Sequence, residues 1–189
     1  AFALLSRVHL FMENYEAAVA AADSVIGNPD YYLRDLKAYQ RGSAVYVTSP
    51  EVIFTHGPNI MAVVHAPVVV SGSGVNQQRI SSGYTTSEDL LACYGENDND
   101  MRLKAFFIER PAPGNGWRCV KTQFNAEEVS DIMAIRVPEV YLNKAEALAL
   151  LGRDAEAIEV LNELREKRLK VAGGVTESGE GLVNFIRDE

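Results

Sequence analysis

Residues 136–168, RVPEVYLNKAEALALLGRDAEAIEVLNELREKR, predict two short helices folded back on each other. Pro138 suits a first helical turn, where its missing N–H would have no partner in any case. Apolar side chains then recur at helical spacing. Gly152 permits the left-handed backbone that ends the first helix, because it has no Cβ to clash. Asp154 is expected to cap the second helix by accepting an N–H group.

Small residues fall where the two predicted helices approach most closely, at Ala145 and Ala157. This pattern is typical of a tetratricopeptide-type hairpin, a repeat that cannot bury its apolar face alone. Residues 3–26, ALLSRVHLFMENYEAAVAAADSVI, form a second copy, in which Tyr15–Val19 corresponds to Asp154–Ile158. The sequence therefore predicts two helical hairpins of the same kind.

The first helix of the N-terminal copy is expected to bury one apolar stripe. Four residues at helical spacing form that stripe and two more lie beside it: Leu4, Val8, Phe11 and Tyr15, with Leu5 and Met12. Glu13 and Asn14 are predicted to make the turn. This assignment places the large apolar side chains of the helix against the core.

The two copies are far apart, since Ala18 and Ala157 are separated by 139 positions. Neighbouring copies in a repeat array are about 34 residues apart. The sequence therefore predicts a single domain fragment, residues 1–189, with a large insertion. Its expected parts are a hairpin at 1–30, a loop-rich and partly β insertion at 31–135, a hairpin at 136–170, and a loop with the start of a further helix at 171–189.

Within the insertion, runs of β-branched and aromatic residues predict short strands. These are Glu51–His56, Met61–Val70, Lys104–Glu109 and Trp117–Thr122, with an extended segment at Ile132–Val137. Ser71–Tyr84 is rich in serine and glycine and predicts a loop. Ser87 is expected to cap a short helix. Asp100 is expected to pair with Arg102 or to lie at a helix end.

The composition excludes some functions. Lys and Arg number 18 against 26 Asp and Glu, a net charge of −8. An acidic chain with no basic run is unsuited to nucleic acid, and no apolar run reaches the length of about 20 residues needed to span a membrane. Ala1 lies inside a helical pattern and the sequence ends inside another, so we expect a piece of a longer protein whose targeting signals lie upstream.

Metal, cofactor and catalytic motifs are not found in the sequence. Cys93 and Cys119 form no CxxC pair, and we expect buried free thiols, or a disulfide if the protein is exported. His9, His56 and His65 show no ligand spacing. No phosphate loop and no Ser/His/Asp arrangement is found, so neither a cofactor nor an enzymatic activity is predicted.

The order of these features resembles the SusD/RagB family of surface nutrient-binding lipoproteins. The strongest match is PEVYLNKAEAL followed by LNELREKR, which resembles the family pattern E-x-YL-x-x-AEA and LN-x-(L/I)R-x-x-R. Further matching pieces are residues 3–26, Glu51–Phe54 and Ser87–Arg102. The resemblance implies a mainly α fold, a SusD-like superhelix of tetratricopeptide-like hairpins with an irregular ligand-binding insertion.

The resemblance also implies a function. Members of the family are tethered by an N-terminal lipid to the outside of the outer membrane of Bacteroidetes-type bacteria. They capture glycans, or in some branches peptides, and pass them to a SusC-type TonB-dependent transporter. No catalytic residue is known for this role of the family. The lipidated cysteine is not in this sequence, which is expected if the sequence is a fragment.

A glycan site needs exposed flat aromatic rings for the apolar faces of sugars, with planar polar groups for the hydroxyls. The insertion offers Trp117, Tyr84, Arg79 and Gln78 as candidate ligand-binding residues. Trp117 follows a Pro/Gly-rich run and either lies at a loop tip or anchors that loop to the core. Tyr94 is expected in the core, because it is on the apolar face of the predicted short helix.

A second interpretation remains open at this point. An intracellular tetratricopeptide-type adaptor would bind a protein or peptide partner in its concave face. That interpretation predicts adjacent repeats, and the insertion of about 100 residues between the two copies argues against it. The sequence upstream would discriminate the two interpretations, since a signal peptide with a lipid-accepting cysteine belongs only to the first.

Overall fold

The computed structural model of the chain describes residues 1–38, 49–56, 68–71, 78–81, 86–94, 99–110, 116–119 and 132–189. Helices dominate these residues, and the strands form three separate two-stranded antiparallel sheets. The mainly α fold class with helical hairpins, predicted from the sequence, is confirmed.

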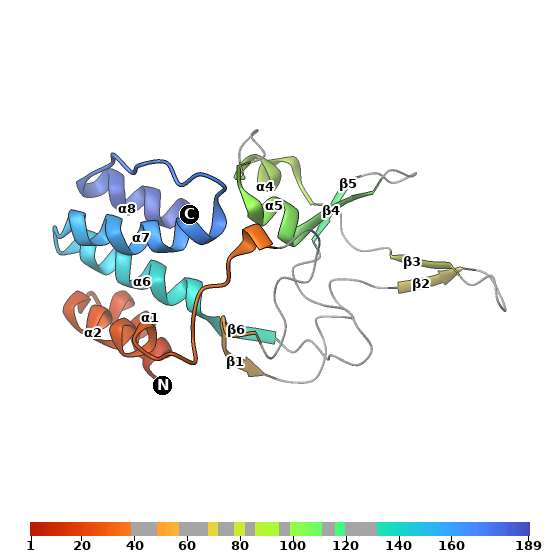
Figure 1. The fold of residues 1–189 in the computed structure, drawn as a ribbon. Coiled ribbons are helices and arrows are strands. Elements are labelled where there is room, and N and C mark those ends of the chain that lie inside the picture. The colour runs from red at the N-terminus through yellow and green to blue at the C-terminus, as the bar shows by residue number, and fades with distance from the viewer. Residues whose placement is uncertain are drawn as a thin grey trace.

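Five helices form a stacked frame at one end of the molecule (Figure 1). They are α1 (Phe2–Phe11), α2 (Tyr15–Ile26), α6 (Val137–Leu150), α7 (Asp154–Arg168) and α8 (Gly179–Asp188). Helix α2 packs against α1 and α6, and α6 also packs against α7 and α8. The two hairpins, distant in the sequence, therefore close into one body.

Left-handed turns join the helices of each pair. Gly152 has φ 72°, as expected, and Glu13 takes the same region with φ 58° although it carries a side chain. Pro138 lies in the first turn of α6. The prediction that Asp154 caps α7 is wrong, because the N-cap is Arg153. Asp154 Oδ2 instead accepts the backbone N–H of Gly179 at 2.8 Å, which holds the start of α8 against α7.

The main core lies between the stacked helices. Ala18, Ala145 and Ala157 are fully buried in it, so the small residues of both hairpins lie in one shared core. Leu148, Leu161, Leu182 and Ile186 fill the remaining space and are also buried. A methyl side chain lets two helix backbones approach, and large side chains from the next turn then interdigitate around it.

The predicted burial of this apolar stripe is wrong except at Tyr15, which is partly buried and packs against the main core. Leu4, Leu5, Val8, Phe11 and Met12 are 40–83% exposed, whereas the buried residues of α1 are Ala3 and Ser6. Asn143 of α6 donates from Nδ2 to Ser6 Oγ at 3.2 Å. Helix α1 carries apolar residues around its circumference, so its periodicity could not identify the face that contacts α6.

The insertion is joined to the frame by short elements. Strand β1 (Val52–His56) pairs with β6 (Ile132–Arg136), with an irregular register near Phe54, and β6 leads directly into α6. The η1 turn (Leu36–Ala38), α4 (Glu88–Ala92) and α5 (Met101–Phe106) lie beside the frame in Figure 1. These elements bring the two ends of the insertion to the same edge of the helical stack.

Two further hairpins belong to the insertion. Strand β2 (Val68–Ser71) pairs with β3 (Gln78–Ser81), and β4 (Phe107–Arg110) pairs with β5 (Gly116–Cys119). The prediction of a loop over Ser71–Tyr84 is therefore wrong at β3. The strand predicted at Lys104–Glu109 begins later, because Asp100 caps α5 by accepting the N–H of Arg102. Residues 61–67 and 120–122 of the other predicted strands are outside the described residues.

The cysteines are not buried. Cys93 and Cys119 are both free and exposed, so the prediction of buried thiols is wrong. Cys93 ends α4, where its Sγ lies 3.3 Å from the carbonyl oxygen of Asp89. Ser87 caps the same helix as predicted, since its Oγ accepts the N–H of Leu90 at 3.2 Å.

Tyr141 on α6 provides a pH-dependent test of the packing between α6 and α7. Burial, followed by the charge of Glu163 and a hydrogen bond with it, raises the pKa of Tyr141 to about 12. The side chain of an unfolded tyrosine has a pKa of about 10, so between pH of about 10 and about 12 the folded state binds more protons than the unfolded state. The free energy of unfolding is therefore expected to fall as the pH rises from about 10 to about 12.

This expectation is checked by urea denaturation across that alkaline range. The Tyr141→Phe variant should lose part of the pH dependence, while Tyr32→Phe, an exposed tyrosine, serves as the matched control. Identical slopes for the original chain and Tyr141→Phe would contradict the assignment.

Candidate functional site

A buried ion pair between Glu51 and Arg168 anchors the insertion to the helical frame. Arg168, the last residue of α7, donates from Nη2 to Glu51 Oε1 at 2.7 Å and from Nη1 to the carbonyl oxygen of Arg34 at 3.0 Å. Glu51 Oε1 also accepts the backbone N–H of Arg34 at 2.8 Å. Both charged side chains are at most 4% exposed. One contact therefore joins the segment before η1, the start of β1 and the end of α7.

Arg136 lies next to this ion pair and is less well compensated. The pKa of Arg136 is lowered overall. Burial lowers it most, the charge of Glu51 raises it, and the charge of Arg168 lowers it further. Among the residues that the structure describes, Nη1 of Arg136 is buried and has no hydrogen-bond partner. Arg136, Arg102 and Arg168 line one cavity of about 280 Å³. An unpaired guanidinium N–H can donate to a carboxylate, hydroxyl or carbonyl oxygen there.

Arg102 on α5 ties the same region to the end of α8. It donates to Asp100 at 2.7–3.1 Å, and its Nη2 lies 3.3 Å from a carboxylate oxygen of Glu189. Burial acts to lower the pKa of Arg102, but the hydrogen bonds and charge of Asp100 outweigh it and the pKa is raised. Its guanidinium also lies 5.4 Å from the ring centre of Tyr94. The predicted pairing of Asp100 with Arg102 is confirmed.

Trp117, the first of the predicted ligand-binding residues, lies on β5 opposite Glu109. Its backbone carbonyl accepts the N–H of Thr86 at 2.7 Å. The indole is partly buried and packs against a small core that includes Met101, Ala105, Phe106 and Phe107. Trp117 therefore anchors the β4–β5 hairpin and is itself only partly buried.

Of the other three predicted ligand-binding residues, the structure describes two. Gln78 and Arg79 lie on β3, where the backbone pairs them with Ser71 and Val70 of β2. Tyr84 is outside the described residues. Figure 1 shows β3 and β5 in two different hairpins. Tyr94 packs on the same small core as Trp117, with its ring centre 5.3 Å from that of Phe107, so its predicted core position is confirmed.

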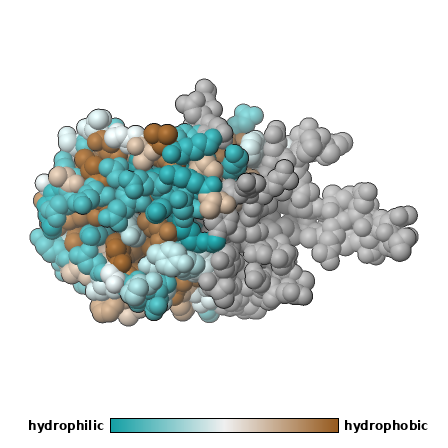
Figure 2. Space-filling view, viewed as in Figure 1, coloured by the Kyte–Doolittle hydropathy of each residue, from teal (hydrophilic) through white to brown (hydrophobic). Residues whose placement is uncertain are grey.

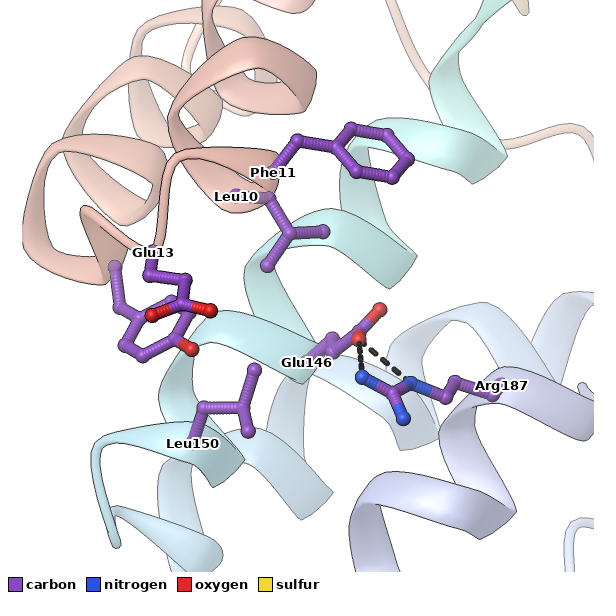
Figure 3. A pocket seen from close by; sticks show the side chains of 7 residues that line it. Leu10, Phe11, Glu13, Glu146, Leu150 and Arg187 are labelled. Atoms are coloured by element: carbon purple, nitrogen blue, oxygen red, sulfur yellow. Dashed lines mark hydrogen bonds and ion pairs between the residues drawn. The ribbon is translucent and has the colours of Figure 1, made fainter.

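A second cavity, of about 440 Å³, opens between α1, α6 and α8 (Figure 3). Leu10, Phe11, Tyr15 and Leu150 give it apolar and aromatic walls. Across it, Arg187 binds Glu146 Oε1 through Nη2 at 2.7 Å and Nε at 2.8 Å. Exposed aromatic rings beside charged planar groups are the combination that meets a sugar ring.

Sequence reasoning missed this cavity, since it assigned Phe11 and Tyr15 to one buried stripe. The available signal was the distribution of apolar residues around α1, which exceeds the single face that one contact can bury. Arg165 holds the end of α8 against α7, because its Nη1 binds Glu189 at 2.8 Å and its guanidinium lies 5.0 Å from the ring centre of Phe185. Arg168, on the same helix, instead binds Glu51, which precedes it by 117 positions in the sequence.

The face of the molecule seen in Figure 2 is mostly hydrophilic over the helical frame, with separate hydrophobic patches. None of the described helices has the length and apolar character needed to cross a membrane. Within the described residues, no group of three or more His, Cys, Asp or Glu side chains is arranged to hold a metal ion.

Comparisons with known proteins agree with this architecture. Residues 120–189 match the model of the SusD family. No curated protein matches the sequence. Among solved structures, the SusD-like carbohydrate binding protein from Bacteroides vulgatus matches 99% of this chain and 40% of its own, with 21% identity and a TM-score of 0.71.

Two SusD superfamily proteins from Bacteroides thetaiotaomicron are also similar. One matches 99% of this chain and 44% of its own, with 17% identity and a TM-score of 0.72. The other matches 89% of this chain and 40% of its own, with 27% identity and a TM-score of 0.63. This chain therefore spans less than half the length of these structures. Residues 120–189 thus match the SusD family model, and nearly the whole chain shares the fold of these SusD-like structures.

Proposed function

We propose that this chain is part of a non-catalytic cell-surface protein that captures glycans for import. The observation that supports the proposal is the fold shared, over 99% of this chain, with the SusD-like carbohydrate binding protein from Bacteroides vulgatus. The full-length protein would be a lipoprotein on the outer membrane and would pass its ligand to a SusC-type TonB-dependent transporter. A peptide ligand is the alternative within the same function.

The division of the chain into a helical frame and an insertion supports this proposal. A binding protein needs a rigid frame and a variable surface mounted on it. The frame is the helical stack, and the Glu51–Arg168 and Arg102–Glu189 contacts hold the insertion against it. Trp117 remains the proposed ligand contact, with Tyr84, Arg79 and Gln78 as further candidates. Affinity would come from aromatic stacking and hydrogen bonds, which require no catalytic group.

The sequence upstream of Ala1 tests the localisation. A signal peptide that ends in a lipid-accepting cysteine is expected, because a lipid chain and the surface position go together in this proposal. An N-terminal start without such a signal would favour the tetratricopeptide-type adaptor and contradict uptake.

Trp117→Ala in the full-length protein is expected to weaken glycan binding by at least about tenfold, equivalent to about 1.4 kcal/mol. Removing a stacked aromatic ring removes contact area that the sugar cannot recover elsewhere. The measurement is calorimetric titration with an oligosaccharide first selected on a glycan array.

Leu103→Ala provides the matched control. Leu103 packs on the same small core as Trp117 but offers no aromatic face. Both variants are expected to lose some stability, and only Trp117→Ala should lose affinity. Equal affinity in the two variants would exclude Trp117 from the site. If the full-length protein binds peptides but none of the glycans, the ligand is a peptide and not a glycan.

A further inference from the structure

The two cysteines of the chain lie on elements of the insertion that are tied together. Cys93 is the C-cap of α4 and Cys119 is the last residue of β5, 26 positions later in the sequence. Both thiols are free and exposed. The backbone N–H of Thr86, just before the N-cap of α4, donates to the carbonyl oxygen of Trp117 on β5 at 2.7 Å. This hydrogen bond holds the start of α4 against the strand that carries Cys119.

Cys119 lies on the face of β5 that meets the small core around Phe107. It is directly opposite Phe107 in the β4–β5 ladder, and opposed residues of an antiparallel pair project from the same face. Phe107 is buried, and its ring centre lies 5.3 Å from that of Tyr94. Trp117, two residues before Cys119 and so on the same face, packs against the same core. The ladder therefore directs Cys119 to the side of the hairpin where Tyr94 packs.

Cys93 reaches the same place from α4, because it directly precedes Tyr94. The pKa of Tyr94 reports both neighbours. Burial raises this pKa most and the charge of Arg102 lowers it, while the charges of Asp100 and of both ionised thiols raise it. A thiolate has such an effect on a phenol only from nearby. Cys93 and Cys119 therefore lie close to one tyrosine side chain, and each is open to a reagent in solution.

We propose that Cys93 and Cys119 are a redox pair, which forms a disulfide between α4 and β5 when the protein is exported to an oxidising compartment. Each thiol loses one proton and one electron, and one S–S bond forms. The oxidant is a disulfide donor, either glutathione disulfide or an oxidised dithiol protein, whose own S–S bond breaks as it takes up both electrons and both protons and leaves as two thiols. The inference rests on the proposed function only for the export that supplies this oxidant.

The disulfide would clamp the part of the insertion that carries the proposed ligand contact. Trp117 is two residues before Cys119, on a strand that the Thr86 hydrogen bond ties to α4. A covalent link between residues 26 positions apart removes conformational freedom from the unfolded segment between them. It also opposes local opening of α4 from the hairpin. The oxidised form is therefore expected to hold the strand of Trp117 more rigidly than the reduced form.

The first test measures disulfide formation in the full-length protein that contains this chain. The protein is equilibrated in glutathione buffers of increasing oxidised fraction, alkylated, digested and analysed by mass spectrometry. A peptide pair joined through Cys93 and Cys119 is expected. Its equilibrium constant should be at least about 100-fold larger in the native protein than in urea, as the chain-entropy model gives for a loop of this length. The controls Cys93→Ser and Cys119→Ser should each form only a mixed disulfide with glutathione.

Three results of this test would overturn the proposal. They are equal equilibrium constants in the native and unfolded protein, glutathione adducts on both native thiols without a joined peptide, and a disulfide between two copies of the protein. No ligand enters the measurement, so its failure is distinct from a failure of glycan capture.

The second test measures amide hydrogen exchange in the reduced and the disulfide-bonded protein. The Thr86 N–H is expected to exchange at least about tenfold more slowly in the oxidised form, because α4 must separate from β5 before that amide is exposed. The Ala157 N–H, which donates to Arg153 within the helical frame, is the matched control and should not change. Unchanged exchange at Thr86 in the disulfide-bonded protein would refute the clamp.

Discussion

Arg168→Ala is expected to lower the free energy of unfolding by about 3–5 kcal/mol, the loss typical of a buried ion pair that loses one partner. The variant leaves the Glu51 carboxylate buried with the backbone N–H of Arg34 but without its cation. It also removes the hydrogen bond to the Arg34 carbonyl. Urea denaturation followed by circular dichroism measures the change.

The control for this prediction is Arg153→Ala. Arg153 also forms an ion pair with a glutamate, Glu156, but both side chains are solvent-exposed, so little change in stability is expected. Arg168→Lys should recover only part of the loss, because an ammonium group cannot reproduce the planar fork that meets Glu51 and Arg34 together. Equal stability of Arg168→Ala and Arg153→Ala would contradict the anchoring role of Arg168.

The double variant Glu51→Leu with Arg168→Met separates charge burial from packing. Replacing both charges by apolar side chains removes the cost of desolvating them. The double variant is therefore expected to be more stable than Arg168→Ala alone. If it is equally unstable, the backbone hydrogen bonds of Arg34 hold the junction, and the charges of the pair do not.

Leu161→Ala has the second largest expected effect, a loss of about 2–5 kcal/mol in the free energy of unfolding. Leu161 on α7 is fully buried in the core that α2, α6, α7 and α8 share. Truncation leaves a cavity that the rigid helix backbones cannot collapse to fill. Because this core includes residues of both hairpins, the loss should appear in one cooperative transition.

Leu90→Ala makes the same chemical change at a 44% exposed leucine on α4, and it should alter the unfolding free energy by less than about 1 kcal/mol. Two separate unfolding transitions in Leu161→Ala, with one unaffected, would contradict a single frame formed by the two hairpins. Differential scanning calorimetry resolves these outcomes.

The contacts that hold the insertion could not be predicted from the sequence. Glu51 and Arg168 are 117 positions apart, and neither belongs to a motif that predicts the other. The sequence gives no signal for such a pair, because two charged residues on separate elements meet only after the intervening chain closes. The sequence likewise does not predict the ion pair between Arg102 and Glu189. Nor does it predict that Phe11 and Arg187 line the same cavity (Figure 3).

The sequence by itself determined the helix pairs, their turns and their close-contact alanines, because helical periodicity, a left-handed turn and small side chains are local properties. Only the tertiary structure decided which face of α1 is buried, that Cys93 and Cys119 are exposed, and how the insertion is anchored. The physical reason is that burial depends on which neighbour covers a surface, and α1 is apolar on two sides. Local pattern fixes the elements, and long-range packing chooses among the faces that they offer.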